Sequence, residues 1–191
     1  MEIKDLYKSF DGKIIFNDAS FNFPENKITY ILGESGRGKT TLLRILAGLD
    51  KDFEATIQPI YSKISYVFQE PRLLTAISSL ENVKIVRENS EAESIKLLSL
   101  FELEDALNKK PEELSGGMKM RVNLARALNY NADLYLMDEP FSALDDAMKD
   151  RILPKVFEIL KNKTVIIVSH NIDEANKYAD NIINLSSPLM N

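Results

Sequence analysis

The pattern of apolar and polar positions along the chain predicts short buried strands separated by helices. Four runs of mainly aliphatic, β-branched and aromatic residues have the length of a strand, at 28–32, 64–68, 134–137 and 164–168. Apolar runs of this kind are typical of a parallel sheet that is covered on both faces. The first 23 residues alternate instead, and Asp11-Gly12 is typical of a hairpin turn between two strands.

Apolar residues at helical spacing occupy much of the chain between these strands. One set follows the run 28–32 and stops at Gly48, a common helix end. The sets are Leu42, Leu43 and Leu46; Ile95, Leu98 and Phe101; Met118, Val122, Ala125 and Leu128; and Ile152, Val156 and Ile159. Pro154 is expected to kink the last of these helices, at 146–161. Alternating strands and helices predict an α/β fold, and the helical period at about 71–130 predicts a helical insertion.

A glycine-rich turn joins the strand 28–32 to the helix after it. Its spacing, Gly33-x4-Gly38-Lys39-Thr40, fits the P-loop pattern, in which backbone N–H groups and a helix N-terminus surround a polyphosphate. Lys39 is expected near the β- and γ-phosphates, and the Thr40 hydroxyl is expected to ligate Mg²⁺. The alternative is a glycine turn that only happens to precede a helix. The residues expected to bind are Gly33, Glu34, Ser35, Gly36, Arg37, Gly38, Lys39, Thr40 and Thr41.

Two carboxylates follow the apolar run 134–137. At the C-terminal end of a strand beside the P-loop, Asp138 is suited to hold Mg²⁺ through water. Glu139 would then point toward the γ-phosphate and polarise the attacking water as a general base. The alternative for these two residues is an acidic strand end at the surface.

His170 is the single histidine of the chain, and it follows the run 164–168. Ligands bind at the C-terminal ends of strands in open α/β sheets, so His170 is expected to contact the γ-phosphate and to hold Glu139 and the water in line. A structural or surface histidine is the alternative.

A second anion site is predicted at Leu114-Ser115-Gly116-Gly117, which opens the helix 118–129. A hydroxyl, bare backbone amides and the positive end of a helix dipole meet there. Because the chain already has one phosphate loop, this second site makes sense if it faces a nucleotide bound by another subunit. The alternative is a helix N-cap followed by flexible glycines.

Composition narrows the class of protein. The chain has 191 residues, of which 45% are hydrophobic and 28% charged, as in a globular protein of one domain. Its net charge of -5 disfavours binding to nucleic acid through a basic face. Cysteine is absent, which excludes disulfides and cysteine catalysis. With no apolar signal core or run of 18 apolar residues, the protein is expected in the cytoplasm.

Taken together and in this order, the motifs resemble those of the ATP-binding cassette (ABC) ATPases over nearly the whole chain. The matching segments are Gly33 to Thr41 (Walker A), Gln69 (Q-loop), Leu114 to Gly117 (signature), Leu134 to Glu139 (Walker B), Ser142 to Asp145 (D-loop) and His170 (switch histidine). The resemblance implies a P-loop NTPase (RecA-like) parallel-sheet core at 1–69 and 131–191, a small antiparallel β subdomain and a helical subdomain at about 71–130.

The same resemblance assigns roles and cofactors. It implies an ATPase that uses ATP and Mg²⁺, with Glu139, His170, Lys39 and Gln69 in catalysis and with Thr40, Gln69 and Asp138 at the metal. It also implies that Phe10 stacks on adenine, for which a strand core residue is the alternative. Met118 and Met120 depart from the family's usual glutamines, and the stretch from Gly48 to Gln69 is shorter than usual.

Partners follow from the resemblance as well. It implies a head-to-tail dimer, in which Ser115, Gly116 and Gly117 of one subunit face the nucleotide of the other. Transmembrane permease subunits are expected at about Gln69–Asn82, with a substrate-binding protein in the complex and the chain on the inner face of the cell membrane. The sequence is weakly similar to the ATPase subunits of nitrate, sulfonate and taurine importers.

Two other classes of protein are disfavoured relative to an importer ATPase. A soluble mechanical ATPase acting on nucleic acid or ribosomes is disfavoured by the single cassette and by the lack of long coiled-coil heptads. A small-molecule kinase or GTPase is disfavoured by the signature segment. In addition, Asn162-Lys163-Thr-Val165 lacks the aspartate that guanine recognition requires.

Overall fold

The computed structural model describes residues 1–87 and 91–185, and its chain divides into two compact units. The first unit comprises Met1–Ile64, Asp133–Glu139 and Leu160–Asn191, and the second comprises Ser65–Ala132 and Pro140–Ile159. Residues 88–90, within the range predicted for the helical subdomain, and 186–191, within that of the core, lie outside the described residues. The predicted subdomain bounds stay predictions, and the second unit also includes Pro140–Ile159.

The first unit contains a three-stranded antiparallel sheet. Its strands are β1 (Glu2–Phe10), β2 (Lys13–Asn22) and β4 (Glu54–Gln58), in the order β2-β1-β4. The predicted hairpin turn joins β1 to β2, with Asp11 at φ 47° and Gly12 at φ 79°. Two consecutive positive φ values match the right-handed twist of the strands, which explains the Asp-Gly pair. Edge strand β4 ends directly before Pro59, which has no N–H to donate to a ladder.

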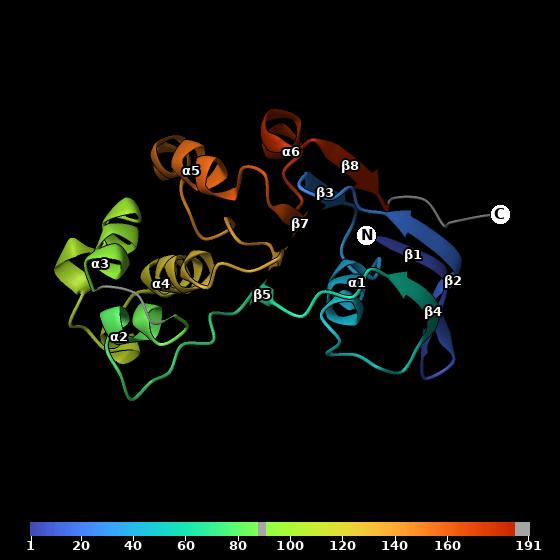
Figure 1. Ribbon diagram of the computed structural model, residues 1–191, viewed down its shortest axis with the longest axis horizontal. Coiled ribbons are helices and arrows are strands. Elements are labelled where there is room, and N and C mark those ends of the chain that lie inside the picture. Colours follow the sequence, from blue (N-terminus) through green and yellow to red (C-terminus); the bar gives the residue numbers. More distant parts are fainter. Residues whose placement is uncertain (88–90, 186–191) are drawn as a thin grey trace. The chain divides into compact units, whose positions relative to one another are not determined.

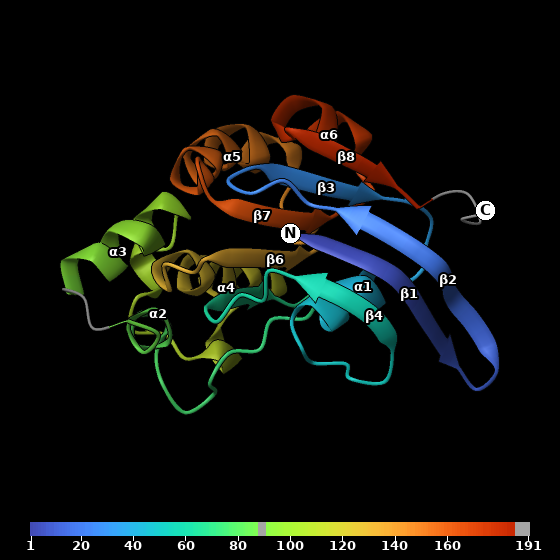
Figure 2. The same ribbon diagram turned by 45° about the vertical axis from the view of Figure 1, so that its right-hand side comes forward.

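The parallel sheet of the first unit carries the site. The strands of this unit run in the order β6-β7-β3-β8 (Figure 2), with bounds β3 (Ile28–Leu32), β6 (Leu134–Asp138), β7 (Thr164–Val168) and β8 (Asn181–Asn184). Every residue of β3, β6 and β7 is buried, as their apolar runs predict. Helix α1 (Lys39–Leu46) packs on β6 and β7, and α6 (Ile172–Tyr178) packs on β3.

The register of the parallel strands brings three chain segments to one sheet edge. Val168 of β7 pairs with Asp138 of β6 and with Ile31 of β3. The residues that follow these positions are the P-loop, Glu139 and His170. The C-terminal edge of the sheet therefore brings the P-loop, Glu139 and His170 together, although they are spread over positions 33 to 170 of the chain.

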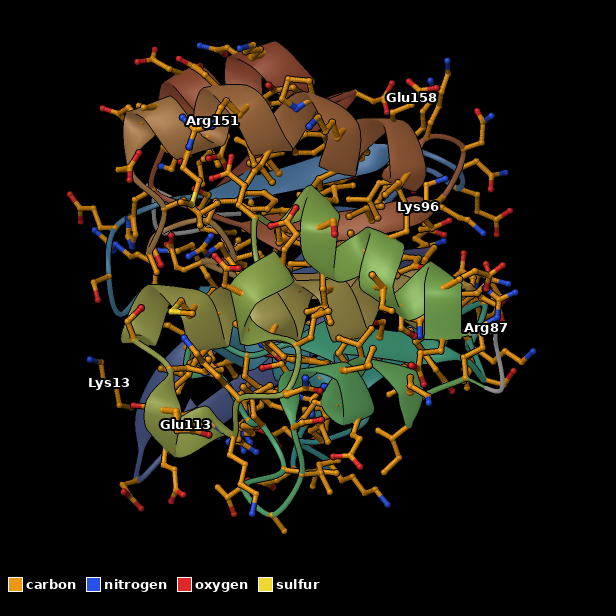
Figure 3. The ribbon with its side chains drawn as sticks, turned by 90° about the vertical axis from the view of Figure 1, so that its left-hand side faces the viewer. Lys13, Arg87, Lys96, Glu113, Arg151 and Glu158 are labelled. Carbon is orange, nitrogen blue, oxygen red and sulfur yellow. The ribbon has the colours of Figure 1, made fainter. Side chains whose placement is uncertain are left out.

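The second unit is mainly helical. Its elements are α2 (Ser79–Lys84), α3 (Glu91–Leu100), the 3-10 turns η1 (Glu104–Ala106) and η2 (Pro111–Glu113), α4 (Gly116–Asn129) and most of α5 (Asp146–Leu160), and β5 (Ile64–Val67) leads into it. Helices α2 and α3 both pack on α4 (Figure 1). Arg151 of α5, labelled in Figure 3, donates from Nε and one terminal nitrogen to the two carboxylate oxygens of Glu102, at 2.7 and 3.0 Å.

Several boundaries differ from those predicted. Helix α4 begins at Gly116 instead of Met118, because Ser115 caps it and places both glycines in its first turn. The strand β5 ends at Val67 and the helix α5 at Leu160, each one residue earlier than predicted, and Pro154 lies inside α5. The sequence analysis missed α2, α6 and β8, which are too short to show a period.

Candidate active site

The P-loop leaves β3 at Gly33 and enters α1 at Lys39. Gly38 caps the helix at φ 85°, and Gly36 has φ 79°. A Cβ on Gly38 would lie 2.6 Å from Ile15 Cγ2 and 2.8 Å from Phe16 Cζ, two side chains of β2. Glycine is therefore required at position 38 both by the left-handed backbone and by the space available. Ile15 and Phe16 support the loop, a role that their strand pattern does not reveal.

Lys39 folds back over the loop. Its Nζ donates to the carbonyl oxygens of Gly33 and Glu34, at 2.5 and 2.8 Å, and lies 3.5 Å from His170 Nε2. Burial lowers the pKa of the Lys39 ammonium, while the charges of Glu139 and Asp138 act in the opposite direction. These carbonyls hold the ammonium within the loop, where the motif requires a cation for the phosphates.

Thr40 and Asp138 meet directly. The Thr40 hydroxyl donates to Asp138 Oδ2 at 2.8 Å, and only 3% of Asp138 is exposed. Burial raises the pKa of the Asp138 carboxyl above its ordinary value, against the effects of the Thr40 hydrogen bond and of Lys39. No group of three or more His, Cys, Asp or Glu that could hold a metal occurs in the described part of the chain. Two hard oxygen donors at one point nevertheless fit Mg²⁺, which takes most of its ligands from phosphates and water.

Glu139 and His170 form the second pair. The Glu139 amide donates to the Val168 carbonyl at 3.0 Å, and its backbone is left-handed at φ 49°. Its Oε1 lies 3.2 Å from His170 Nε2, and its side chain is 15% exposed. Burial raises the pKa of the Glu139 carboxyl, an effect that His170 and Lys39 oppose. A carboxylate with a raised pKa beside an imidazole is suited to take a proton from water.

A pocket of about 500 Å³ adjoins the P-loop within the first unit. Its walls are Lys13 to Asn17 from β2, Glu34 to Arg37 from the P-loop, and Leu185. Arg37 and Glu34 form an ion pair across the loop, at 3.1 Å. Phe10, the predicted base-stacking residue, pairs with Lys13 across the hairpin and is 46% exposed. It therefore stands next to the residue at which the pocket begins.

The predicted signature segment has the local geometry of a helix N-terminus. Ser115 is the N-cap of α4, and its Oγ accepts from the Met118 amide at 3.3 Å. A Cβ on Gly116 would meet nothing within 4 Å, whereas one on Gly117 would lie 3.4 Å from the Ala143 carbonyl oxygen. The amides of Gly116 and Gly117 belong to the first turn of α4, whose orphan N–H groups suit an anion.

Gln69 begins a loop of the second unit that polar side chains hold in place. Asn82 accepts from the Leu74 amide at 2.9 Å and donates to the carbonyls of Leu74 and Ser78, each at 3.0 Å. Arg126 donates to the Arg72 carbonyl at 2.6 Å. The loop thus has a defined conformation, and Leu74 remains 47% exposed on it.

Among the predicted site residues, the structure brings five together at one sheet edge of the first unit: Lys39, Thr40, Asp138, Glu139 and His170. The remaining P-loop residues adjoin them, with Glu34, Ser35, Gly36 and Arg37 on the pocket wall. Gln69, Ser115, Gly116 and Gly117 belong to the second unit. The fold and the first unit's site together define a P-loop nucleotide-binding protein.

Comparisons with known proteins place the chain more narrowly. The family model described as ABC transporter matches residues 16–142. The aliphatic sulfonates import ATP-binding protein SsuB 2 of Pseudomonas syringae pv. tomato is 33% identical over 191 residues, covering 98% of this chain and 82% of its own. The phosphonates import ATP-binding protein PhnC of Fusobacterium nucleatum is 35% identical over 219 residues, covering 98% and 89%. The dimeric structure of MJ0796, a bacterial ABC transporter cassette, has a TM-score of 0.85 at 30% identity, covering 97% and 94%.

The chain belongs to the ABC transporter family and is an ABC ATPase. This confirms the family, the fold class and the ATPase activity that the motifs predicted. The soluble mechanical ATPase is not favoured. Within the described residues, no helix is long and apolar enough to cross a membrane.

Proposed function

We propose that the chain is the ATP-hydrolysing subunit that powers an importer through separate membrane subunits. The observation that supports this best is the convergence of Lys39, Thr40, Asp138, Glu139 and His170 at one edge of the parallel sheet. The ATP-binding proteins SsuB 2, for sulfonate import, and PhnC, for phosphonate import, resemble the chain about equally, at 33% and 35% identity.

The P-loop residues bind the nucleotide. The amides from Gly33 to Thr41 surround the β- and γ-phosphates, and Lys39 exchanges its contacts with the Gly33 and Glu34 carbonyls for phosphate oxygens. Thr40 and Asp138 would hold Mg²⁺, and Gln69 stays a predicted further ligand. When bound, the ion neutralises charge on the phosphates. The base stacks against Phe10 beside the pocket that begins at Lys13.

Glu139 and His170 activate and orient the attacking water. The Glu139 carboxylate accepts a proton from the water. Burial raises the pKa of this carboxyl toward neutral pH, which makes it a better base. His170, 3.2 Å from Glu139 Oε1, orients the carboxylate and contacts the γ-phosphate. The carboxylate is largely buried, so bulk water does not compete for its contact with His170.

A second copy completes the site. In the proposed head-to-tail dimer, Ser115, Gly116 and Gly117 at the N-terminus of α4 face the γ-phosphate held by the partner subunit. The partner's phosphate would bind at a helix N-terminus whose first-turn glycines leave the backbone amides accessible. Closure with ATP and reopening after hydrolysis would then provide the two states that drive transport.

The membrane subunits would dock on the loop at Gln69–Asn82, on the cytoplasmic face of the membrane, with a substrate-binding protein in the complex. This docking site is supported by the conformation that Asn82 and Arg126 impose on the loop, on which Leu74 is exposed. A loop that is ordered before binding loses less conformational entropy on docking.

Two measurements test the proposed function. The purified chain should hydrolyse ATP in the presence of Mg²⁺. Glu139→Gln should slow turnover by at least about 100-fold but retain ATP binding, whereas Glu93→Gln, an exposed control on α3, should match the wild type. The chain should also co-purify with membrane subunits in detergent, and Leu74→Glu should weaken that association without changing basal ATPase activity. Stoichiometric nucleic acid in a detergent-free preparation would contradict the importer.

A further inference from the structure

Lys8 is a buried lysine outside the predicted site. It lies on β1, and 1% of its side chain is exposed. Its Nζ donates to Asp50 Oδ1 at 3.0 Å, to Asp52 Oδ2 at 3.3 Å and to the Asp52 main-chain carbonyl. Burial acts to lower the pKa of Lys8, but the hydrogen bonds to Asp50 and Asp52, together with their charges, outweigh it and raise the pKa. The side chain is therefore a charged ammonium anchored at three acceptors.

The ammonium has a fourth neighbour. Its Nζ lies 4.4 Å from the centroid of the Phe10 ring, within the range at which a cation is attracted to the face of an aromatic ring. Because the two carboxylates fix the ammonium, this contact restrains the ring. It also occupies one face of Phe10, while 46% of the residue stays exposed.

Phe10 lies beside the pocket that adjoins the P-loop, where its ring can contact a base. It ends β1 and pairs with Lys13, the first residue of the pocket wall that continues through Ile15 and Phe16 to the P-loop. On the other side, Asp50 follows the P-loop helix, and its amide donates to the Arg44 carbonyl at 3.2 Å. Lys8 thus links the chain after the C-terminal end of α1 to the ring beside the pocket.

We propose that Lys8 is a positioning residue for nucleotide binding, which holds the Phe10 ring so that its outward face stacks on the base. This inference rests on the proposed function, because it needs a nucleotide in the P-loop pocket. Stacking on a ring that is already oriented loses less conformational entropy than stacking on a mobile ring. Lys8 therefore contributes to the affinity for the base and leaves the affinity for the phosphates unchanged.

The test compares ATP with inorganic tripolyphosphate, which offers phosphates to the P-loop but has no base. Dissociation constants are measured by calorimetry at one ionic strength for wild type, Lys8→Met, Phe10→Leu and the double variant. Lys8→Met should weaken ATP binding about fivefold, and Phe10→Leu about tenfold or more. Neither should change tripolyphosphate binding, and the double variant should bind ATP no more weakly than Phe10→Leu.

Lys4→Met is the matched control, because Lys4 lies on the same strand and its side chain forms an exposed ion pair with Glu2. It should bind both ligands like the wild type. Lys8→Met leaves Asp50 without its cation, so Lys8→Met/Asp50→Asn is measured as well, and thermal unfolding confirms that each variant is folded. Lys8→Met/Asp50→Asn should show the same selective loss of ATP affinity as Lys8→Met.

Three results would overturn the inference and leave the proposed function standing. These are an equal loss of ATP and tripolyphosphate affinity in Lys8→Met, additive losses in the Lys8→Met/Phe10→Leu variant, and unchanged ATP affinity in folded Lys8→Met/Asp50→Asn. A wild-type chain that binds neither ATP nor tripolyphosphate would instead overturn the proposed function, and this inference with it.

Discussion

The Thr40 hydroxyl donates a 2.8 Å hydrogen bond to Asp138 Oδ2, joining the first turn of α1 to the C-terminal end of β6. The two residues are 98 positions apart: Asp138 ends β6 in the buried core of the sheet, and Thr40 is the second residue of α1, which packs on that core. Because both elements are held by that core, the two oxygens meet without either backbone segment having to move. This geometry gives the strongest reason to place Mg²⁺ here.

Asp138→Asn should separate metal binding from stability. The amide cannot replace the carboxylate charge at Mg²⁺, so ATPase activity should fall by about two orders of magnitude, and the Mg²⁺ concentration for half-maximal activity should rise. Without nucleotide and metal, the variant should unfold at a higher temperature than wild type at pH 7, because burial raises the pKa of Asp138 and disfavours its charged form. Calorimetry and a Mg²⁺ titration measure the two effects. Equal activity at all Mg²⁺ concentrations would remove Asp138 from the metal site.

Glu139→Gln should trap the chain with ATP bound. Glutamine retains the shape of the side chain but cannot accept the proton from water, so turnover should slow by at least about 100-fold. ATP binding should persist, and an ATP-bound dimer should accumulate on size-exclusion chromatography with light scattering. Hydrolysis at the wild-type rate would show that Glu139 is not the base.

Ser115 should act on the nucleotide of the partner subunit. A Ser115→Arg chain and a Lys39→Ala chain should each be inactive alone, since one fills the anion site at α4 and the other lacks the phosphate-binding ammonium. Mixed together, they should recover activity from one intact site per heterodimer, up to about a quarter of the wild-type rate if the chains pair at random and the sites are independent. Mixtures are assayed with the membrane subunits present. No recovery under those conditions would contradict the shared site.

The sequence predicted the parts of the fold that are buried on both faces. The strands β3 and β7 match their apolar runs residue for residue, because a covered parallel strand admits few polar side chains. Strand β8 was missed because it is four residues long and alternates between intermediate and exposed positions. Helices α2 and α6 have six and seven residues, too few for a helical period, and begin at side-chain caps, Ser78 and Asn171.

The sequence predicted the site as a set of motifs, but it could not predict the contacts between them. The pattern places Thr40 and Asp138 at the ends of elements, but only the register of β3, β6 and β7 sets their separation. The Lys8 cluster left no local signal, since Asp50 lies 42 positions from Lys8 and reaches it through the packing of β1 against the chain after α1. A lysine in an alternating strand is expected at the surface.

Asp180 should make the stability of the first unit depend on pH. Its carboxylate accepts from the Ile28 amide at 2.9 Å and from Lys27 at 3.0 Å, and these bonds lower its pKa below the ordinary value, the backbone bond most. A carboxyl with a lowered folded pKa stabilises above its unfolded pKa, and this contribution is lost as the pH falls through the folded pKa. Asp180→Asn should therefore cost up to about 1 kcal/mol at pH 7, a modest value because the side chain is partly exposed.

The difference between the two proteins should shrink as the pH falls below about 4, the ordinary range of an aspartate. Urea unfolding at pH 7, 5 and 3.5 measures it. Asp11→Asn is the control, because Asp11 is exposed in the turn between β1 and β2, and it should not reproduce this trend. A difference that is constant with pH would mean that the charge of Asp180 does not matter.

Gly38→Ala and Gly12→Ala compare two glycines with nearly the same backbone, at φ 85° and 79°. Both alanines would adopt a left-handed conformation, which costs about 1–2 kcal/mol. Only at Gly38 would the new methyl also lie 2.6 Å from Ile15 Cγ2, whereas at Gly12 nothing lies within 4 Å. Gly38→Ala should therefore lose about 1–3 kcal/mol more stability than Gly12→Ala, from the overpacking against β2. It should also weaken tripolyphosphate binding, because the displaced loop no longer aligns its amides, while Gly12→Ala binds it normally. Equal effects of the two substitutions on stability and on binding would show that the contact with Ile15 and Phe16 does not shape the P-loop.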